Sequence, residues 1–161
     1  MKSHTGGVIS FGHGALHTRS SKQKLNTKSS TEAELVGVSD YLPYNIWMLN
    51  FLKEQGYDLK SNVLYQDNQS AIKMEINGRN SCTGNSRHID IRYFFVKDQI
   101  DKGYLTVKYY STDQMLADFF TKSLQGADFI KFRNEIMGHT SITLPTDSSR
   151  EIKESVEDPK I

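Results

Sequence analysis

The stretch Val63-Leu64-Tyr65-Gln66-Asp67-Asn68-Gln69 decides how the rest of this sequence is interpreted. Its short apolar and aromatic run begins with a β-branched residue and predicts a buried strand, and the residues after Asp67 favour a turn or a helix start. Asp67 therefore falls at the carboxyl end of a strand. In open α/β sheets, ligands and metals bind at this edge, where the following helices present their positive ends. A second interpretation is that Asp67 only caps a helix over 68–76.

The composition predicts one soluble domain. The chain has 161 residues, of which 37% are hydrophobic, and its eight Phe, eight Tyr and one Trp can build a core. Cys82 is the only cysteine, which excludes an intrachain disulfide and a multi-cysteine zinc site and fits a reducing compartment. No apolar run approaches the roughly 20 residues that span a bilayer, and the first residues do not have the apolar core of a signal peptide. We therefore expect a soluble, intracellular protein with no membrane partner.

The formal net charge is only +1, but the charge is unevenly distributed. No acidic residue precedes Glu32, whereas basic residues do: Lys2, Arg19, Lys22, Lys24 and Lys28. A basic amino end suits a polyanion partner, and a solvated, flexible segment has the same composition. The segment after Gly138 is hydrophilic, has more acidic than basic residues and contains no Phe, Tyr or Trp. We expect residues 139–161 to form a disordered acidic tail.

The pattern of apolar and turn residues predicts an α/β fold. Segments 6–12 and 14–18 favour a β-hairpin around Gly12-His13-Gly14, followed by a polar loop over 19–30. A long helix begins at the hydroxyl and acidic residues near 29–34 and is expected to kink, or to split into two helices, at Pro43. The remaining expected elements are a strand at 63–66, a helix at 68–76, a loop to 86, a helix around 89–100, a strand at 104–109, a helix carrying 115–120 and an amphipathic helix at 127–137.

Three acidic residues occur in separate expected elements. Glu34 lies in the first turns of the long helix, Asp67 at the strand end and Asp118 inside a late helix. Scattered acids usually do no more than solvate a surface, so the sequence around them has to decide whether they share a site.

Four segments contain or flank these acids: 29–35 (SSTEAEL), 65–72 (YQDNQSAI), 87–95 (RHIDIRYFF) and 117–122 (ADFFTK). The residues of these segments, their order and their spacing closely resemble those of the ribonuclease H domain of copia-type LTR retrotransposon Pol polyproteins. The resemblance runs from about Lys2 to Gly138 and implies a ribonuclease H-like mixed sheet flanked by helices over residues 1–138. It also implies an endonuclease that cuts the RNA strand of RNA–DNA hybrids. The implied partner is the preceding reverse transcriptase segment, and the implied location is the cytoplasm or retrotransposon particles.

Carried over residue by residue, the resemblance assigns Glu34, Asp67 and Asp118 as three of the family's four catalytic, metal-binding acids. Carboxylates are hard oxygen ligands, and two Mg²⁺ or Mn²⁺ ions about 3.5–4 Å apart activate water and stabilise the leaving oxygen. We expect Asp67 to bridge or flank both ions, Glu34 to hold the leaving-group side and Asp118 the attacking-water side. Glu34 is preferred to Glu32 because the family's catalytic Glu directly precedes the leucine that is Leu35 here.

Hybrid recognition is expected to follow shape, with backbone and 2′-hydroxyl contacts across the minor groove. Polar residues beside the proposed metal ligands and cations in the loops are the candidates for these contacts: Ser29, Ser30, Asn68, Gln69, Lys22, Lys24, Lys28, Arg79 and Arg87. The alternative is that the polar residues cap helices and that the cations are simply solvated.

Family members carry a first, central strand with an Asp immediately upstream of the segment that begins here at Lys2. Residues 1–161 contain neither, so the resemblance predicts a truncated domain with its first central strand missing, which cleaves very weakly or not at all in isolation. The main alternative is a degenerate, non-catalytic remnant that at most binds hybrids or has a structural role. A host α/β interaction domain with no dependence on divalent metal is a third interpretation. An in-frame Asp-bearing strand upstream of Met1 in the nucleotide sequence favours the nuclease, and a stop codon favours the remnant.

Overall fold

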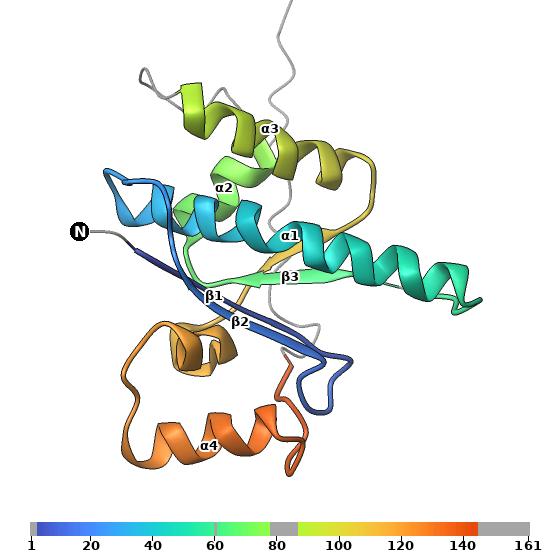
Figure 1. Ribbon diagram of the computed structural model, residues 1–161, viewed down its shortest axis with the longest axis vertical. Coiled ribbons are helices and arrows are strands. Elements are labelled where there is room, and N and C mark those ends of the chain that lie inside the picture. The colour runs from blue at the N-terminus through green and yellow to red at the C-terminus, as the bar shows by residue number, and fades with distance from the viewer. Residues whose placement is uncertain (1–2, 60, 78–86, 145–161) are drawn as a thin grey trace, which may run out of the picture.

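The computed structural model describes residues 3–59, 61–77 and 87–144, with only the backbone for 87–90. The strands are β1 (His4–Ile9), β2 (His17–Lys22), β3 (Val63–Gln66) and β4 (Thr106–Tyr109). The α-helices are α1 (Ser30–Glu54), α2 (Gln69–Asn77), α3 (Arg87–Asp101) and α4 (Gly126–Ile136), and the 3-10 helices η2 (Thr112–Gln114) and η3 (Leu116–Phe120) precede α4. The expected α/β class is confirmed (Figure 1).

The strands form two separate two-stranded sheets. β1 pairs antiparallel with β2, with Gly6 opposite Ser20, and β3 pairs parallel with β4, with Leu64 opposite Val107. Within the described residues no ladder joins β1 to β3, so the single mixed sheet that the resemblance implies is not formed by these strands. Parallel strands normally lie inside larger sheets that are covered on both faces. Each two-stranded sheet therefore has a strand edge that would be paired in a larger sheet.

The hairpin is longer than the sequence predicted. Gly12 and Gly14 have φ values of 97° and 68°, in the left-handed region that favours glycine, so the position of the turn is confirmed. The expected loop from residue 19 is wrong, because β2 continues to Lys22. Its residues alternate between half-buried and exposed, which polar side chains tolerate in a strand that has one solvated face.

Two successive glycines allow β1 to be covered closely on both faces. A Cβ atom on Gly6 would lie 2.5 Å from Thr121 Cγ2 and 2.7 Å from the Ala117 carbonyl oxygen of η3. A Cβ atom on Gly7 would lie 2.6 Å from the Tyr41 ring of α1. Because neighbouring residues of a strand face opposite sides, η3 and α1 approach β1 from opposite faces.

The long helix α1 passes through Pro43 without dividing, so the two-helix alternative is wrong. Proline inside a helix costs about 3 kcal/mol. Leu35 and Leu42, before the proline, and Leu49, after it, are all buried, and burial of such side chains offsets a cost of this size. The helix begins as predicted, because the Glu32 N–H donates to Ser29 Oγ at 3.1 Å.

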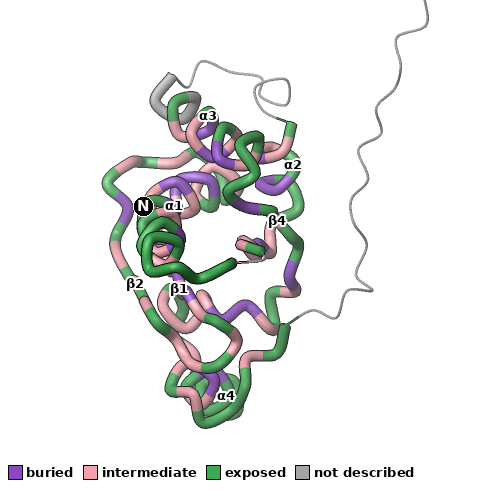
Figure 2. The backbone as a smooth tube through the Cα atoms, turned by 90° about the vertical axis from the view of Figure 1, so that its right-hand side faces the viewer, coloured by how far each residue is buried: buried purple, intermediate pink, exposed green. Residues whose placement is uncertain are grey.

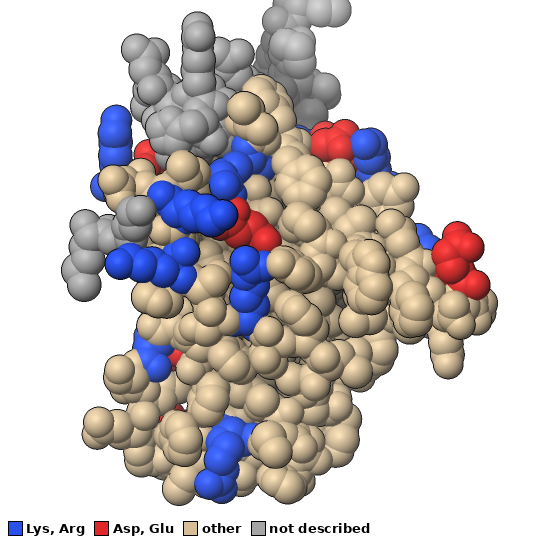
Figure 3. Space-filling view, in the orientation of Figure 1, with Lys and Arg blue, Asp and Glu red and all other residues tan. Residues whose placement is uncertain are grey.

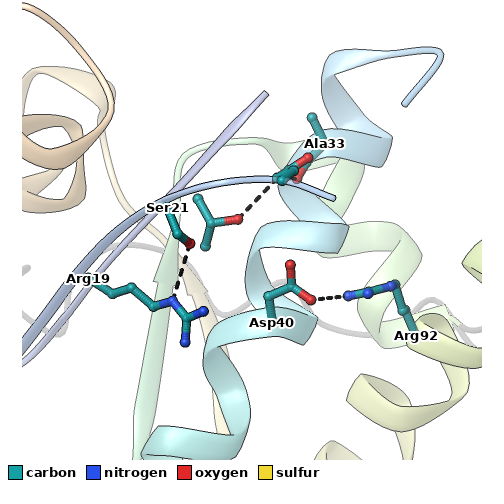
Figure 4. A network of polar contacts seen from close by, with 7 residues as sticks. Arg19, Ser21, Ala33, Asp40 and Arg92 are labelled. Atoms are coloured by element: carbon teal, nitrogen blue, oxygen red, sulfur yellow. Dashed lines mark hydrogen bonds and ion pairs between the residues drawn. The ribbon is translucent and has the colours of Figure 1, made fainter. Parts of the chain in front are cut away.

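The main core lies where α1 packs against α3, and buried positions gather there in Figure 2. Its members are Leu35, Leu42, Tyr93, Val96 and Leu105. A half-buried ion pair between Arg92 of α3 and Asp40 of α1 joins the same two helices (Figure 4). None of the helices in the described part of the chain is both long and apolar enough to cross a membrane.

The carboxyl-terminal third departs from prediction in two places. The helix expected around residues 115–120 is a pair of short 3-10 helices, separated at Met115, whose backbone is extended. The disordered tail does not begin at residue 139, because the Ile142 N–H donates to the Gly12 carbonyl at 3.0 Å and the Tyr110 hydroxyl donates to the Thr143 carbonyl. Residues 78–86, expected as a loop, and 145–161 lie outside the described residues.

Candidate active site

Three acidic side chains from separate elements border one cavity of about 570 Å³. Glu34 comes from the start of α1, Asp67 directly follows β3, and Asp118 lies in η3. The glycine pair in β1 explains part of this arrangement, since it lets α1 and η3 pack against the same strand. The structure therefore brings together the three acids that the sequence left scattered.

The three carboxylates are close enough to influence one another. The pKa of Glu34 is raised, first because the surrounding protein displaces water and then because Asp67 and Asp118 repel a further negative charge, while Lys122 opposes the rise. Glu34 is nevertheless exposed, and it borders the cavity. The pKa of Asp118 is also raised, chiefly by burial, with Lys122 lowering it and Asp67 raising it. Repulsion of this kind is relieved by a proton or a cation.

Two of the three carboxylates already have polar partners. The Lys122 ammonium donates to Asp118 Oδ2 at 2.6 Å, and the Thr112 hydroxyl donates to Asp67 Oδ2 at 3.0 Å. Among the described residues, no three Asp, Glu, His or Cys side chains lie near enough to hold a metal ion as they stand. The ligand chemistry therefore fits a hard divalent cation, but the spacing is not that of a closed metal centre.

The alternative roles of two acids can be decided from their contacts. Asn68, not Asp67, caps α2, since its Oδ1 accepts the Ala71 N–H at 3.1 Å. Glu32 accepts the backbone N–H of Lys28 at 2.7 Å and so belongs to the start of α1. Of the acids in the segments 29–35 and 65–72, Glu34 and Asp67 are the ones that border the cavity.

The predicted nucleic-acid contacts fall into three groups. Ser29 and Asn68 cap helices, as their alternative role required, and Ser30 and Gln69 are exposed at the first positions of α1 and α2. Lys22, Lys24 and Lys28 are exposed on β2 and the loop before α1, and basic side chains gather over this part of the face shown in Figure 3. Arg79 and the side chain of Arg87 lie outside the described residues. Contact of any of them with nucleic acid stays a prediction.

Glu75 is a buried acid behind the cluster that the sequence analysis missed. It is fully buried on α2, where its carboxylate faces the side chain of Gln66. Burial raises the pKa of Glu75 to about 8, with Gln66 lowering it and Glu34 raising it. Glu75 is therefore largely protonated at neutral pH. The available signal was its spacing of four residues from Ala71 on the buried face of a short helix.

Comparison with known proteins points to one class of polyprotein. The chain is 36% identical, over 121 residues or 75% of its length, to the retrovirus-related Pol polyprotein from transposon TNT 1-94 of Nicotiana tabacum. The chain is similar to a segment of retrotransposon Pol polyproteins. The corresponding polyproteins from transposons RE1 and RE2 of Arabidopsis thaliana are 34% and 33% identical over 132 residues, or 81% of the chain.

The chain spans 9% of the length of each of these curated relatives. The similarity supports a retrotransposon-derived protein and the context of a polyprotein. No family model matches the chain, and no solved structure matches it.

The coupling between the acids predicts how the titration of Glu34 responds to substitution. Replacing Asp67 by Asn removes a neighbouring negative charge, so the pKa of Glu34 is expected to fall towards its ordinary value. The measurement is an NMR titration of the Glu34 side-chain carboxyl carbon in the native chain and in Asp67→Asn.

Asp113→Asn is the matched control for this titration. Asp113 is exposed, is hydrogen-bonded to Ser111 and is not among the groups that shift Glu34. The control should leave the titration of Glu34 unchanged. An equal shift in both variants would mean that general charge, and not the meeting of the three acids, sets the pKa.

The buried Glu75 predicts a loss of stability with rising pH. Its folded pKa of about 8 lies above the ordinary value of 4.5, so between these pH values the unfolded chain gives up the proton more readily. The free energy of unfolding should therefore fall as the pH rises from 4.5 to about 8. The fall is at most about 1.4 kcal/mol for each pH unit. Urea unfolding at several pH values should show Glu75→Gln gaining stability relative to the native chain as pH rises.

Glu54→Gln controls for the loss of a carboxylate, because Glu54 is an exposed acid at the end of α1. Its stability relative to the native chain should not change systematically over the same window. A flat difference for Glu75→Gln as well would show that Glu75 is ionised in the folded protein.

Proposed function

We propose that this chain forms the ribonuclease H part of a retrotransposon Pol polyprotein and hydrolyses the RNA strand of RNA–DNA hybrids with divalent metal ions. The proposal is carried by the convergence of Glu34, Asp67 and Asp118 from three separate elements at one cavity. The similarity to transposon Pol polyproteins supports the same context.

In this proposal Glu34, Asp67 and Asp118 hold Mg²⁺ or Mn²⁺, which when bound supplies Lewis-acid chemistry and an activated water. The Thr112 hydroxyl orients Asp67 through the hydrogen bond to its Oδ2. Lys122 neutralises Asp118 and competes with a metal ion for its Oδ2. The mutual repulsion of the acids favours this exchange.

The hybrid is proposed to lie across the amino-terminal ends of α1 and α2. Ser30 and Gln69 are exposed there, and Lys24 and Lys28 extend the surface with positive charge. Backbone N–H groups at helix starts favour anionic groups such as phosphates. A hybrid bound by its backbone and shape needs no base-specific contacts.

The cluster as it stands predicts weak catalysis. Two divalent cations carry more charge than three carboxylates balance, and one of the three is already paired with Lys122. The described residues do not form a closed metal centre, so residues 1–161 need a further ligand for full activity. The same observations favour the second candidate function, a non-catalytic module that binds hybrids.

Hybrid cleavage tests the proposal directly. With Mg²⁺ or Mn²⁺, residues 1–161 are expected to cut a labelled RNA–DNA hybrid very weakly or not at all. A longer Pol segment that continues upstream of Met1 and brings an Asp-bearing strand should cut faster by orders of magnitude. In that longer segment Asp67→Asn should abolish cutting and Asp113→Asn should not. Duplex DNA and single-stranded RNA serve as substrate controls.

One outcome would contradict the expected weak activity of residues 1–161, and another would contradict the metal assignment. Robust cutting by residues 1–161 that Asp67→Asn abolishes would show that the three acids suffice. A longer segment that unfolds cooperatively, and is therefore folded, but cuts nothing with either metal would remove the metal assignment and leave the binding module.

Hybrid binding is expected to depend on Lys24 and Lys28. If each meets one phosphate, replacing both by Gln should reduce the slope of log affinity against log salt by about 2, since each lost contact accounts for about 1. Fluorescence anisotropy with an uncut hybrid at several salt concentrations measures this slope. Lys102→Gln is the control, because Lys102 is exposed but paired with Asp98. Equal losses in the two variants would rule out a specific basic surface.

A further inference from the structure

We propose that the outer side of α1, together with Arg19 of β2, is a stacking platform for the unpaired bases of single-stranded nucleic acid. Tyr44, Trp47 and Phe51 form this side of the helix, and we call them the aromatic stripe. They recur at spacings of three and four residues, which place side chains on one side of a helix. The proposal concerns a second binding surface and does not depend on hydrolysis of a hybrid.

The aromatic stripe is exposed on a side of α1 that does not face the core. The exposed fraction is 39% for Tyr44, 62% for Trp47 and 46% for Phe51, whereas Leu42 and Leu49 of the same helix are buried. Exposed apolar residues that occur singly need no explanation, but a contiguous exposed patch with polar groups around it marks an interaction site. The arrangement of the rings and the charges beside them identify the partner.

Trp47 and Phe51 already form a stacked pair. Their ring centroids lie 5.5 Å apart, and the angle between the ring planes is 12°. Residues four apart on a helix are neighbours on its surface, so the helix itself holds the two rings in this orientation. The pair therefore offers a flat aromatic surface that is ordered before any partner binds. Every base has a π face and can stack on such a surface, whatever the sequence.

Arg19 fixes a positive charge beside Tyr44, at the end of the aromatic stripe nearest the start of α1. Its Cζ lies 4.8 Å from the centroid of the Tyr44 ring, and its guanidinium donates to the Tyr44 hydroxyl and, at 3.2 Å, to Ser21 Oγ (Figure 4). Among the described residues no ion pair joins Arg19 to an acid. A guanidinium held in this way keeps N–H groups with which to bind a phosphate.

The charge around the aromatic stripe favours an anionic partner. The acid that precedes it on the same side of α1 is Asp40, which is paired with Arg92. Lys24 and Lys28 lie before the helix, and basic side chains gather at this end of α1 in Figure 3. Glu54, exposed at the other end of α1, disfavours phosphates there. The favourable region therefore runs from the start of α1 along the stripe.

Positive charge beside stacked aromatic rings selects single-stranded nucleic acid. A single strand is a polyanion whose bases are free to stack on protein side chains. In a duplex or a hybrid the bases are stacked and paired inside the helix, so their faces cannot reach the aromatic stripe. A second copy of this chain fits less well, because the same cations would face one another across the contact.

The length of the aromatic stripe limits the number of bases that it contacts. From Tyr44 to Phe51 the helix advances about 10 Å, at about 1.5 Å per residue. Successive bases of a stacked strand lie about 3.4 Å apart. The stripe therefore accommodates about two or three nucleotides. RNA and DNA share the phosphates and bases that this surface contacts.

Trp47 is the only tryptophan in the chain, so its fluorescence reports directly on the stripe. The full chain is titrated with ten-nucleotide oligouridine and oligodeoxythymidine in EDTA, which prevents hydrolysis. Quenching of Trp47 emission is expected, and quenching by one of the two strands alone identifies RNA or DNA as the ligand. A blunt-ended RNA–DNA hybrid of the same length should leave the emission unchanged, whether or not it binds near the acidic cluster.

Aromatic and cationic variants test the two parts of the surface. Phe51→Leu should weaken binding of a labelled single strand, measured by fluorescence anisotropy, at least about fivefold. Phe94→Leu is the matched control and should leave the affinity unchanged, because Phe94 is 50% exposed but lies on α3. Arg19→Gln should weaken binding and reduce the slope of log affinity against log salt by about 1.

An abasic strand is a control that leaves the protein unchanged. It keeps the phosphates and loses the bases, so it should bind at least about fivefold more weakly and should not quench Trp47. If Phe51→Leu or Arg19→Gln does not fold, this comparison still separates base stacking from attraction by charge alone.

Four results overturn the proposal. The first three are no quenching by either single strand, equal affinity for the abasic strand, and equal affinities of Phe51→Leu and Phe94→Leu. The fourth is a change in Trp47 emission with protein concentration alone, accompanied by a dimer in sedimentation, which would make the stripe an interface between copies of this chain. Failure of hybrid cleavage would overturn the proposed nuclease function and would leave this proposal standing.

Discussion

The close approach of α1 and η3 to the two glycines of β1 is the contact on which the arrangement of this molecule depends. Any side chain at Gly6 would meet Thr121 and the Ala117 carbonyl, and any side chain at Gly7 would meet the Tyr41 ring. Because neither glycine has a side chain, α1 and the 3-10 helix η3 can lie against opposite faces of β1. Glu34 and Asp118 reach the same cavity because their elements are held in this way.

The sequence predicted the elements in which the spacing of apolar residues within the element itself reveals the buried face. The strand β3 and the helices α1, α2, α3 and α4 follow from apolar spacing and helix-start residues, with ends displaced by a few positions. The extension of β2 over residues 19–22 was missed because its polar residues need only one covered face. The helix expected at 115–120 was wrong, because the backbone of the buried Met115 is extended and separates two short 3-10 helices.

The candidate site was predictable only in part, and for a physical reason. Glu34, Asp67 and Asp118 were chosen because their surrounding motifs resemble those of a family, since nothing in their spacing along the chain brings them together. Lys122 and Thr112 hold two of the acids through tertiary contacts that a linear pattern does not encode. Glu75 escaped attention because a carboxylate on a short helix is normally solvated, whereas here the helix turns it inward. Lys122 thus neutralises part of the negative charge of the three acids, and the buried Glu75 lies behind them with its pKa raised.

The last described segment of the chain returns to the first hairpin. The Ala15 N–H donates to the Ile136 carbonyl at 2.9 Å, the Ile142 N–H donates to the Gly12 carbonyl, and the backbones of Gly14 and Gly138 lie close together. These contacts join residues that lie far apart in the sequence. Contacts so distant in sequence slow folding, because a long loop has to close before they form. A nascent chain therefore displays an unsupported hairpin turn until α4 has emerged from the ribosome.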